Sequence, residues 1–147
     1  MSKTARSTAR SAARLAAVQA MYQYQMEATP LARLLNEFHQ HRLGREIEDE
    51  QYADAEVDFF DDLVRGTVSR AEEIDALVAG KLAEGWSLAR LDKTMVQILR
   101  VGTYELLARA DVPTGAAISE YVDVAHAFFE EREAKLDRKS TRLNSSH

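Results

Sequence analysis

The sequence predicts an all-α protein. Glycine and proline together make up only 8 of the 147 residues, so extended loops are scarce. Apolar residues recur at the three- and four-residue spacing of helices, and no useful length of chain alternates with the two-residue period of strands. Hydrophobic residues make up 46% of the chain, which is enough for one domain with a substantial core.

The first two helices are expected at about residues 4–26 and from Pro30 onward. The apolar stripe of the first helix is formed by Leu15, Val18, Tyr22 and Met26. Thr29 is a suitable N-cap for the second helix, and Pro30 at its first position loses no hydrogen bond. The second stripe follows with Leu31, Leu34, Leu35 and Phe38. Residues 43–56 are charged and lack periodicity, so we expect a connection there.

A longer apolar pattern begins near Asp54 and runs through Val57, Phe60, Val64, Thr67, Ala71, Ile74 and Val78. We expect Gly66 to divide this pattern into two helices, because glycine is unfavourable inside a helix. Residues 83–92 form a corner in which Ser87 or Asp92 caps the next helix. Two further helices are marked by Met95, Ile98, Leu99, Gly102, Leu106 and Leu107, and then by Ile118, Tyr121, Val122, Ala125, Phe128 and Phe129.

The last eleven residues, DRKSTRLNSSH, differ in style from everything before them. They are polar and unpatterned, and they resemble the translated read-through of a sequencing adapter. We therefore expect residues 137–147 to be a non-native tail and exclude them from the fold. The alternative is an ordinary disordered tail.

Charge is distributed unevenly along the chain, whose net charge is −5. Residues 1–26 hold four cations and no Asp or Glu, whereas residues 27–136 hold 12 Lys or Arg against 23 Asp or Glu. A basic arm on an acidic body predicts a polyanionic partner for the arm, and nucleic acid is the simplest such partner.

On a helix, the four cations of this arm fall on one arc. With Arg6 at zero, Arg10 lies at about 40°, Lys3 at about 60° and Arg14 at about 80°. The apolar stripe is centred about 120° away. We therefore expect the helix to bury its apolar stripe and to present the cations to a phosphate backbone. The alternative is a solvated helix face that only gives solubility.

Hydroxyl, amide and tyrosine side chains accompany the cations: Ser2, Thr4, Ser7, Thr8, Ser11, Gln19, Tyr22, Gln23, Tyr24 and Gln25. Hydroxyls bond phosphate oxygens, amides read base edges and tyrosines stack on unpaired bases. This mixture favours single-stranded RNA over a DNA major groove, because no helix-turn-helix pattern accompanies it. The sequence leaves open whether Tyr22 or Tyr24 stacks a base.

Other chemistries have little support. The chain has no Cys, and His39 and His41 would point about 200° apart on a helix, so we expect no metal site. Asp58, Asp61 and Asp62 share a helix face, but acids in a first turn usually complement the helix dipole. Without a phosphate loop or a nucleophile–base pair, we expect neither an enzyme nor a cofactor. No apolar run reaches the ~20 residues of a membrane span and no secretory signal is present, so we expect a cytoplasmic protein.

Three stretches resemble the NusB family of bacterial transcription antitermination factors. They are ARSAARLAAVQAMYQYQ, FFDDLVRGTVSRAEEIDAL and GWSLARLDKTMVQILRVGTYELLARADVPTGAAISEYVDVAHAFF, and the resemblance covers about residues 5–136. It implies one domain over residues 1–136, made of two packed helical bundles with subdomains at about 1–83 and 84–136. It also implies binding to boxA single-stranded RNA of ribosomal RNA leader transcripts, a heterodimer with the small-subunit ribosomal protein NusE, and assembly on RNA polymerase.

The resemblance also assigns roles to single residues. The implied RNA contacts are Lys3, Arg6, Arg10, Arg14 and Arg100, and the implied partner contacts are Tyr22 and Met95. The alternative for Arg100 is a salt bridge, for example with Glu105, and the alternative for Tyr22 is core packing. Met95 stands where the family often has an acid, so a partner contact there would be apolar.

Two further departures from the family pattern stand out. Ser119 replaces a common Asn, and the family's closing helix is missing after Lys135, which would expose apolar surface on the last helix and leave the chain marginally stable. Two other functions stay open. One is a detached RNA-recruiting module like that preceding the catalytic domain of some ribosomal RNA cytosine methyltransferases, and the other is a helical scaffold without an RNA role.

Overall fold

The computed structural model describes residues 2–41, 43 and 50–145, and the side chains of residues 8–41, 43 and 56–136. The regular elements in these residues are all helices, which confirms the predicted all-α fold. They are α1 (Ser2–Glu27), α2 (Leu31–His41), α3 (Glu50–Ser69), α4 (Ala71–Lys81), the short 3₁₀ helix η1 (Leu88–Arg90), α5 (Lys93–Ala108) and α6 (Thr114–Ser145). No helix in the described part of the chain is long and apolar enough to cross a bilayer.

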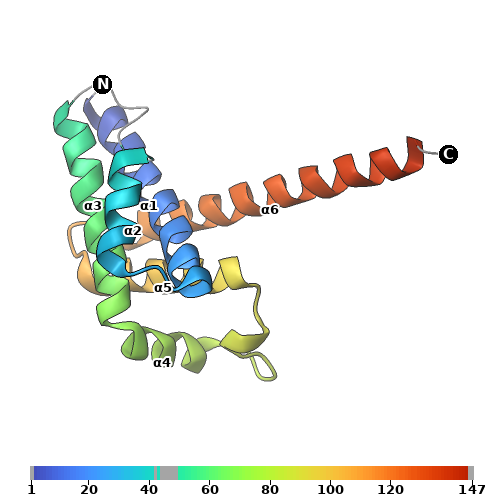
Figure 1. Cartoon of the computed structure of the whole chain (residues 1–147). Helices are drawn as coiled ribbons and strands as arrows, with labels where there is room; N and C mark the ends of the chain where they lie inside the picture. The colour runs from blue at the N-terminus through green and yellow to red at the C-terminus, as the bar shows by residue number, and fades with distance from the viewer. Residues whose placement is uncertain (1, 42, 44–49, 146–147) are drawn as a thin grey trace.

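The helices form a body from which one helix projects. Figure 1 shows α1, α2 and α3 side by side, with α5 crossing near their lower ends and α4 below it. Helix α6 starts beside α5, and its C-terminal half extends away from the other helices. Helix α6 continues through residues 137–145, where the sequence predicts an unpatterned tail. That residues 137–147 are non-native stays a prediction.

One hydrophobic cluster joins side chains from all six α-helices. Its fully buried members include Leu34 of α2, Phe60 of α3, Ile74 of α4 and Val101 of α5. The subdomain boundary expected near residue 84 falls in the loop after α4, but buried side chains connect the helices before and after it. The division into subdomains stays a prediction.

The long apolar pattern in the middle of the chain is divided at Arg70, and not at Gly66 as the sequence suggests. Gly66 lies inside α3, where any side chain would overlap the ring of Tyr104 from α5. The glycine therefore permits two helices to pack closely and does not end a helix. The Tyr104 hydroxyl donates to Asp62 Oδ1 at 2.7 Å, which fastens the contact.

Asp92 caps α5, and it is one of the two caps that the sequence predicts for this helix. Its Oδ1 accepts hydrogen bonds from the backbone N–H groups of Thr94 at 2.9 Å and Met95 at 3.3 Å. Its Oδ2 accepts from Arg132 Nη1 at 2.6 Å, and this bond, with the backbone bonds, lowers the pKa of Asp92. Ser87 precedes η1 without a side-chain cap. The Asp92 carboxylate thus fixes the start of α5 and fastens α6 to it.

Candidate functional site

Helix α1 buries a different face from the one the sequence predicts. Its buried side chains are mostly alanines, and the set is Ala9, Ala13, Arg14, Ala16, Ala17, Val18, Ala20 and Met21. With Arg6 at zero, Ala17 lies at about 20°, inside the arc of the cations. Of the predicted apolar stripe, Val18 is buried but Tyr22 and Met26 are 40% and 44% exposed. The expectation that α1 buries its large apolar residues and presents its arginines is therefore wrong for Tyr22, Met26 and Arg14.

Arg14 is buried in an ion-pair network. Its Nε donates to Glu105 Oε1 at 2.9 Å, and its Nη2 donates to Glu105 Oε2 at 2.8 Å. Its Nη1 lies 3.5 Å from Glu120 Oε2, and the Tyr121 hydroxyl donates to Glu105 Oε1 at 2.8 Å. Arg14 is 3% exposed and Glu105 is fully buried. We call Arg14, Glu105, Glu120 and Tyr121 the Arg14 cluster.

The pKa values in the Arg14 cluster follow from burial and pairing. Burial and the charge of Glu105 raise the pKa of the Tyr121 hydroxyl, which therefore stays protonated and donates. Burial acts to lower the pKa of Arg14, but the hydrogen bonds and charge of Glu105 more than offset it, so this pKa is raised. Removing one partner of such a buried pair typically costs ~3–5 kcal/mol. Arg14 is therefore a structural residue, and the prediction that it contacts RNA is corrected.

Arg10 lies at the outer edge of this region, where three guanidinium groups surround the Phe59 ring. Those of Arg109, Arg14 and Arg10 lie 4.8, 5.3 and 5.4 Å from the ring centroid. Arg10 Nη2 pairs with Asp111 Oδ2 at 3.2 Å, and the two side chains are 29% and 50% exposed. An exposed pair of this kind contributes only ~0–1 kcal/mol, so a phosphate can compete for Arg10.

Lys3 and Arg6 lie in the first turns of α1, but their side chains are outside the described residues. Together with Arg10 they span about 11 Å along the helix axis. Figure 1 shows this end of α1 at the end of the body remote from α4. Their role in RNA binding stays a prediction.

Arg100 forms a second bidentate ion pair near the opposite end of α1. Its Nε and Nη2 donate to Asp75 Oδ1 and Oδ2 at 2.8 and 2.9 Å, and its Nη1 donates to Gln25 Oε1 at 2.6 Å. Gln97 Nε2 donates to the same Gln25 oxygen. The salt bridge foreseen as an alternative for Arg100 thus exists, but with Asp75 of α4 and not with Glu105. We call Gln25, Asp75, Gln97 and Arg100 the Arg100 cluster.

A cavity of about 350 Å³ opens beside the Arg100 cluster. Its walls are formed by Met21, Tyr24, Gln25, Thr67, Val68, Ala71 and Arg100. Behind this wall, Gln97 is 1% exposed. Its Oε1 is the single buried side-chain oxygen or nitrogen without a hydrogen-bond partner among the residues whose side chains the structure describes. The Arg14 cluster contains no such atom.

Tyr22 lies on the outer face of α1, so the alternative of core packing is wrong for this residue. It borders a hollow of about 280 Å³, whose walls also include Gln19 of α1, Thr94 of α5 and Phe128 of α6. An exposed tyrosine beside a hollow of mixed polarity suits a protein contact. The assignment of Tyr22 to a partner surface stays a prediction.

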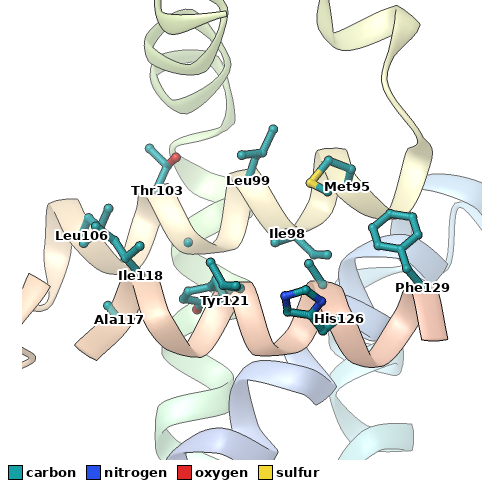
Figure 2. Close-up of a pocket in the computed structure, with 13 residues that line it drawn as sticks. Met95, Ile98, Leu99, Thr103, Leu106, Ala117, Ile118, Tyr121, His126 and Phe129 are labelled. Carbon is teal, nitrogen blue, oxygen red and sulfur yellow. The ribbon is translucent and has the colours of Figure 1, made fainter. Parts of the chain in front are cut away.

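Helices α5 and α6 enclose an apolar groove of about 400 Å³. Figure 2 shows Met95 and Phe129 at one end of this groove and Leu106 and Ile118 at the other. Ile118 and Val122 are 51% and 49% exposed. Apolar side chains gathered along an open groove mark an interaction surface. The partner contact of Met95 stays a prediction.

Acidic and histidine side chains elsewhere hold the helices together. His39 Nε2 and Asp61 Oδ1 lie 2.6 Å apart, and Asp62 accepts from Tyr104 and from Arg109 Nη1, the latter at 3.2 Å. These two acids lie in the middle of α3, so they pair with neighbouring helices and do not complement the start of a helix. Within the described part of the chain, no group of three His, Cys, Asp or Glu could hold a metal ion.

Sequence reasoning missed the partners of the two arginines. Glu105 and Gln97 each stand between apolar residues of α5, and a buried polar group requires a partner. That pattern signals a buried polar contact, but it does not say which arginine reaches it. Asp75 carries no distinguishing signal in the sequence.

Comparison with known proteins gives a consistent result. A sequence model of the NusB family matches residues 11–136. The chain is similar to the transcription antitermination protein NusB of Sphingopyxis alaskensis, with 66% identity over 118 residues that cover 80% of this chain and 79% of that protein. It is 68% identical over 120 residues to the protein of the same name from Novosphingobium aromaticivorans, covering 82% and 81%.

Two solved structures share the fold. T. maritima NusB superposes with a TM-score of 0.65 at 29% identity, covering 81% of this chain and 78% of that chain. A chain from a structure described as "Crystal Structure of a Plectonemic RNA Supercoil" superposes with a TM-score of 0.69 and covers 87% of both chains. Its identity of 24% supports the fold alone.

Proposed function

We propose a function that proceeds from one premise: the chain belongs to the NusB family of transcription antitermination factors, which are non-enzymatic RNA-binding proteins. The chain binds boxA-type single-stranded RNA of ribosomal RNA leader transcripts through the N-terminal end of α1. It acts in the cytoplasm with a NusE-type ribosomal protein, within the antitermination complex on RNA polymerase.

The acid-free N-terminal run of α1 supports the RNA site. Residues 1–26 contain no Asp or Glu, and the ion pair of Arg10 with Asp111 is exposed, although its guanidinium also lies against the Phe59 ring. Lys3, Arg6 and Arg10 can therefore meet successive phosphates, whereas Arg14 is committed to Glu105. Arg100 is held by Asp75 at the far end of the helix, so we do not count it as a phosphate contact.

The protein partner is assigned to the surface around Tyr22 and Met95. The hollow beside Tyr22 includes Thr94 and Phe128, and the groove beside Met95 includes Phe129. Because these residues are neighbours along α5 and α6, the two hollows adjoin where α5 begins. A partner that covers this surface meets one exposed tyrosine and an apolar edge, which is the usual composition of an interface centre.

The salt dependence of RNA binding tests the phosphate contacts. Anisotropy of a labelled boxA-like strand should give a slope of log K against log salt of about −2, from three contacts at about −0.7 each. The double variant Lys3→Ala/Arg6→Ala should reduce the slope to about −0.7. Arg33→Ala is a matched control, because Arg33 is an exposed arginine on α2 paired only locally with Glu37, and it should leave the slope unchanged.

Addition of the ribosomal protein should increase the affinity for this strand. Binding that does not depend on salt, or no binding to a boxA-like strand with or without the partner, would contradict the proposal. The methyltransferase-module alternative gains no support from the comparisons, because relatives that the chain matches over 79–81% of their length are named antitermination proteins.

A further inference from the structure

The cavity beside the Arg100 cluster has the chemistry of a base-binding site. Its volume of about 350 Å³ lies at the lower end of the ~300–1,000 Å³ typical of small-molecule pockets. Its walls combine the ring of Tyr24, the amide of Gln25 and the guanidinium of Arg100 with an apolar surface from Met21 and Val68. Aromatic rings, guanidinium planes and amides are the groups that bind unpaired bases.

Arg100 is held in a fixed plane at this site. Its two hydrogen bonds to Asp75 and one to Gln25 all lie in the plane of the guanidinium, because its N–H groups do. These bonds leave the flat faces of the guanidinium for stacking. The side chain is 19% exposed, so part of it is accessible from the cavity.

The amide of Gln25 has a fixed orientation. Its Oε1 accepts from both Arg100 Nη1 and Gln97 Nε2, which are donors on two sides of the same oxygen. A carbonyl oxygen has two lone pairs, so this one is fully used. The remaining hydrogen-bonding group of Gln25 is its Nε2, and the residue as a whole is exposed. Gln25 therefore offers the cavity a donor and no acceptor.

The buried side chain of Gln97 is unfavourable for the stability of the fold. A buried polar atom without a partner typically costs ~1–3 kcal/mol, and Gln97 Oε1 is such an atom. An apolar residue of similar size would avoid this cost at the same position. The bond from Gln97 to Gln25 orients an exposed amide.

We propose that the cavity beside the Arg100 cluster receives one unpaired base of the bound RNA. Tyr24 and Arg100 stack on the base, Gln25 donates to an acceptor on its edge, and Gln97 is a positioning residue that orients Gln25. This inference rests on the proposed RNA-binding function and adds the second end of the RNA path. Gln25 lies 15 residues beyond Arg10, which is about 22 Å along α1, so a strand bound at the arm reaches the cavity within a few nucleotides.

A donor-only amide selects among bases. Uracil presents O4, an acceptor, where cytosine presents the N4 amino group, a donor. The two pyrimidines are otherwise similar in size, so a Gln25 donor placed against the 4-position of the base should prefer uracil. Two donors facing each other leave both without a partner, and we expect at least about a fivefold difference in affinity between the two bases at this position.

Single abasic substitutions locate the bound base. The full chain is titrated with labelled boxA-like strands that lack one base at each position in turn. For the unchanged protein, one position should lose about tenfold in affinity. Gln25→Ala and Tyr24→Ala should reduce that loss to less than about twofold, because the cavity no longer holds the base. Gln19→Ala, the same amide on the same helix beside the other hollow, should retain the full loss.

Gln97→Leu separates positioning from packing. It should leave the affinity for the strand with uracil nearly unchanged but reduce the preference for uracil over cytosine toward parity. A residue with only a packing role would not change base preference. If the abasic losses are the same in all variants, the base-binding inference is wrong while the proposed function stands. If the unchanged protein binds no RNA, both are wrong.

The protein partner provides a further test of the same cavity. If Gln25→Ala weakens binding of the ribosomal protein in the absence of RNA and leaves the abasic losses unchanged, the cavity belongs to the protein interface and the inference is overturned. If partner binding is unaffected and the abasic loss disappears, the cavity is a base site.

Discussion

The Arg14 cluster and the Arg100 cluster are both built on an ion pair between an arginine and a carboxylate, but they differ in how accessible that pair is. In each, an arginine forms a bidentate pair with a carboxylate, and each links α1 to α5. Arg14 is buried, and Glu105 has no exposed surface. Arg100 borders an open cavity and is connected to a buried amide oxygen that has no partner.

This difference distinguishes structural from functional cations. The family resemblance implies an RNA contact for both arginines, but only the surroundings decide which one a ligand can reach. A cluster whose polar atoms are all satisfied holds helices together and has nothing to offer a ligand. A cluster with an unsatisfied atom and an open cavity is a candidate for recognition.

The largest expected effect is on stability at the Arg14 cluster. Arg14→Met leaves the carboxylate of Glu105 buried without its cation, and the free energy of unfolding should fall by ~3–5 kcal/mol. Arg100→Met is the matched control, and it should cost about 1 kcal/mol or less because its pair is partly exposed. Urea denaturation followed by circular dichroism measures both. Equal losses would show that the two clusters do not differ as described.

A smaller effect is expected when Tyr121 loses its hydroxyl. Tyr121→Phe removes a hydrogen bond to a charged acceptor, worth ~1.5–3 kcal/mol. Burial and the neighbouring acids raise the pKa of Tyr121, and they raise the pKa of Tyr104 to about 12, above the ordinary value of 10.0. The folded state therefore keeps protons that the unfolded state releases, and stability falls as the pH rises above about 10.

The Tyr121→Phe variant should lose part of this alkaline dependence. Unfolding midpoints measured between pH 8 and pH 12 provide the comparison. A variant whose stability depends on alkaline pH as steeply as the unchanged protein would argue against a protonated donor at Tyr121.

The smallest expected effect is a gain in stability. Gln97→Leu removes a buried oxygen without a partner, and the chain should gain about 1 kcal/mol of stability. The Arg14 cluster has no position where truncating a single polar group should stabilise the protein. A thermal melt detects the gain as a higher midpoint. A clear loss of stability would indicate that Gln97 is needed for packing, which would weaken its assignment to recognition.

Much of the fold could be predicted from the sequence because helices are local. The apolar periodicity placed all six α-helices, and Asp92 was among the two caps proposed for α5. The apolar pattern predicts the break at Gly66, because glycine is unfavourable inside a helix, whereas the structure has it at Arg70. The actual role of Gly66 depends on Tyr104, which lies 38 positions further along the chain.

The candidate site was predicted less well, because the orientation of α1 depends on its neighbours. Alanines give a helix little preference for the face it buries, since each side chain contributes little apolar area. The larger residues Tyr22 and Met26 suggested the wrong face. The alanine face admits close packing by α3 and α5, and it brings Arg14 to Glu105.

By itself, the sequence determined the helical architecture, the acid-free arm and the membership of the NusB family. The first two follow from local residue patterns, and the third follows from shared motifs. Only the tertiary structure decided which arginines are accessible. The acids that hold Arg14 and Arg100 are Glu105 and Asp75, which are 91 and 25 positions away. Charge pairing over such separations is settled by how the helices pack, and no local pattern encodes it.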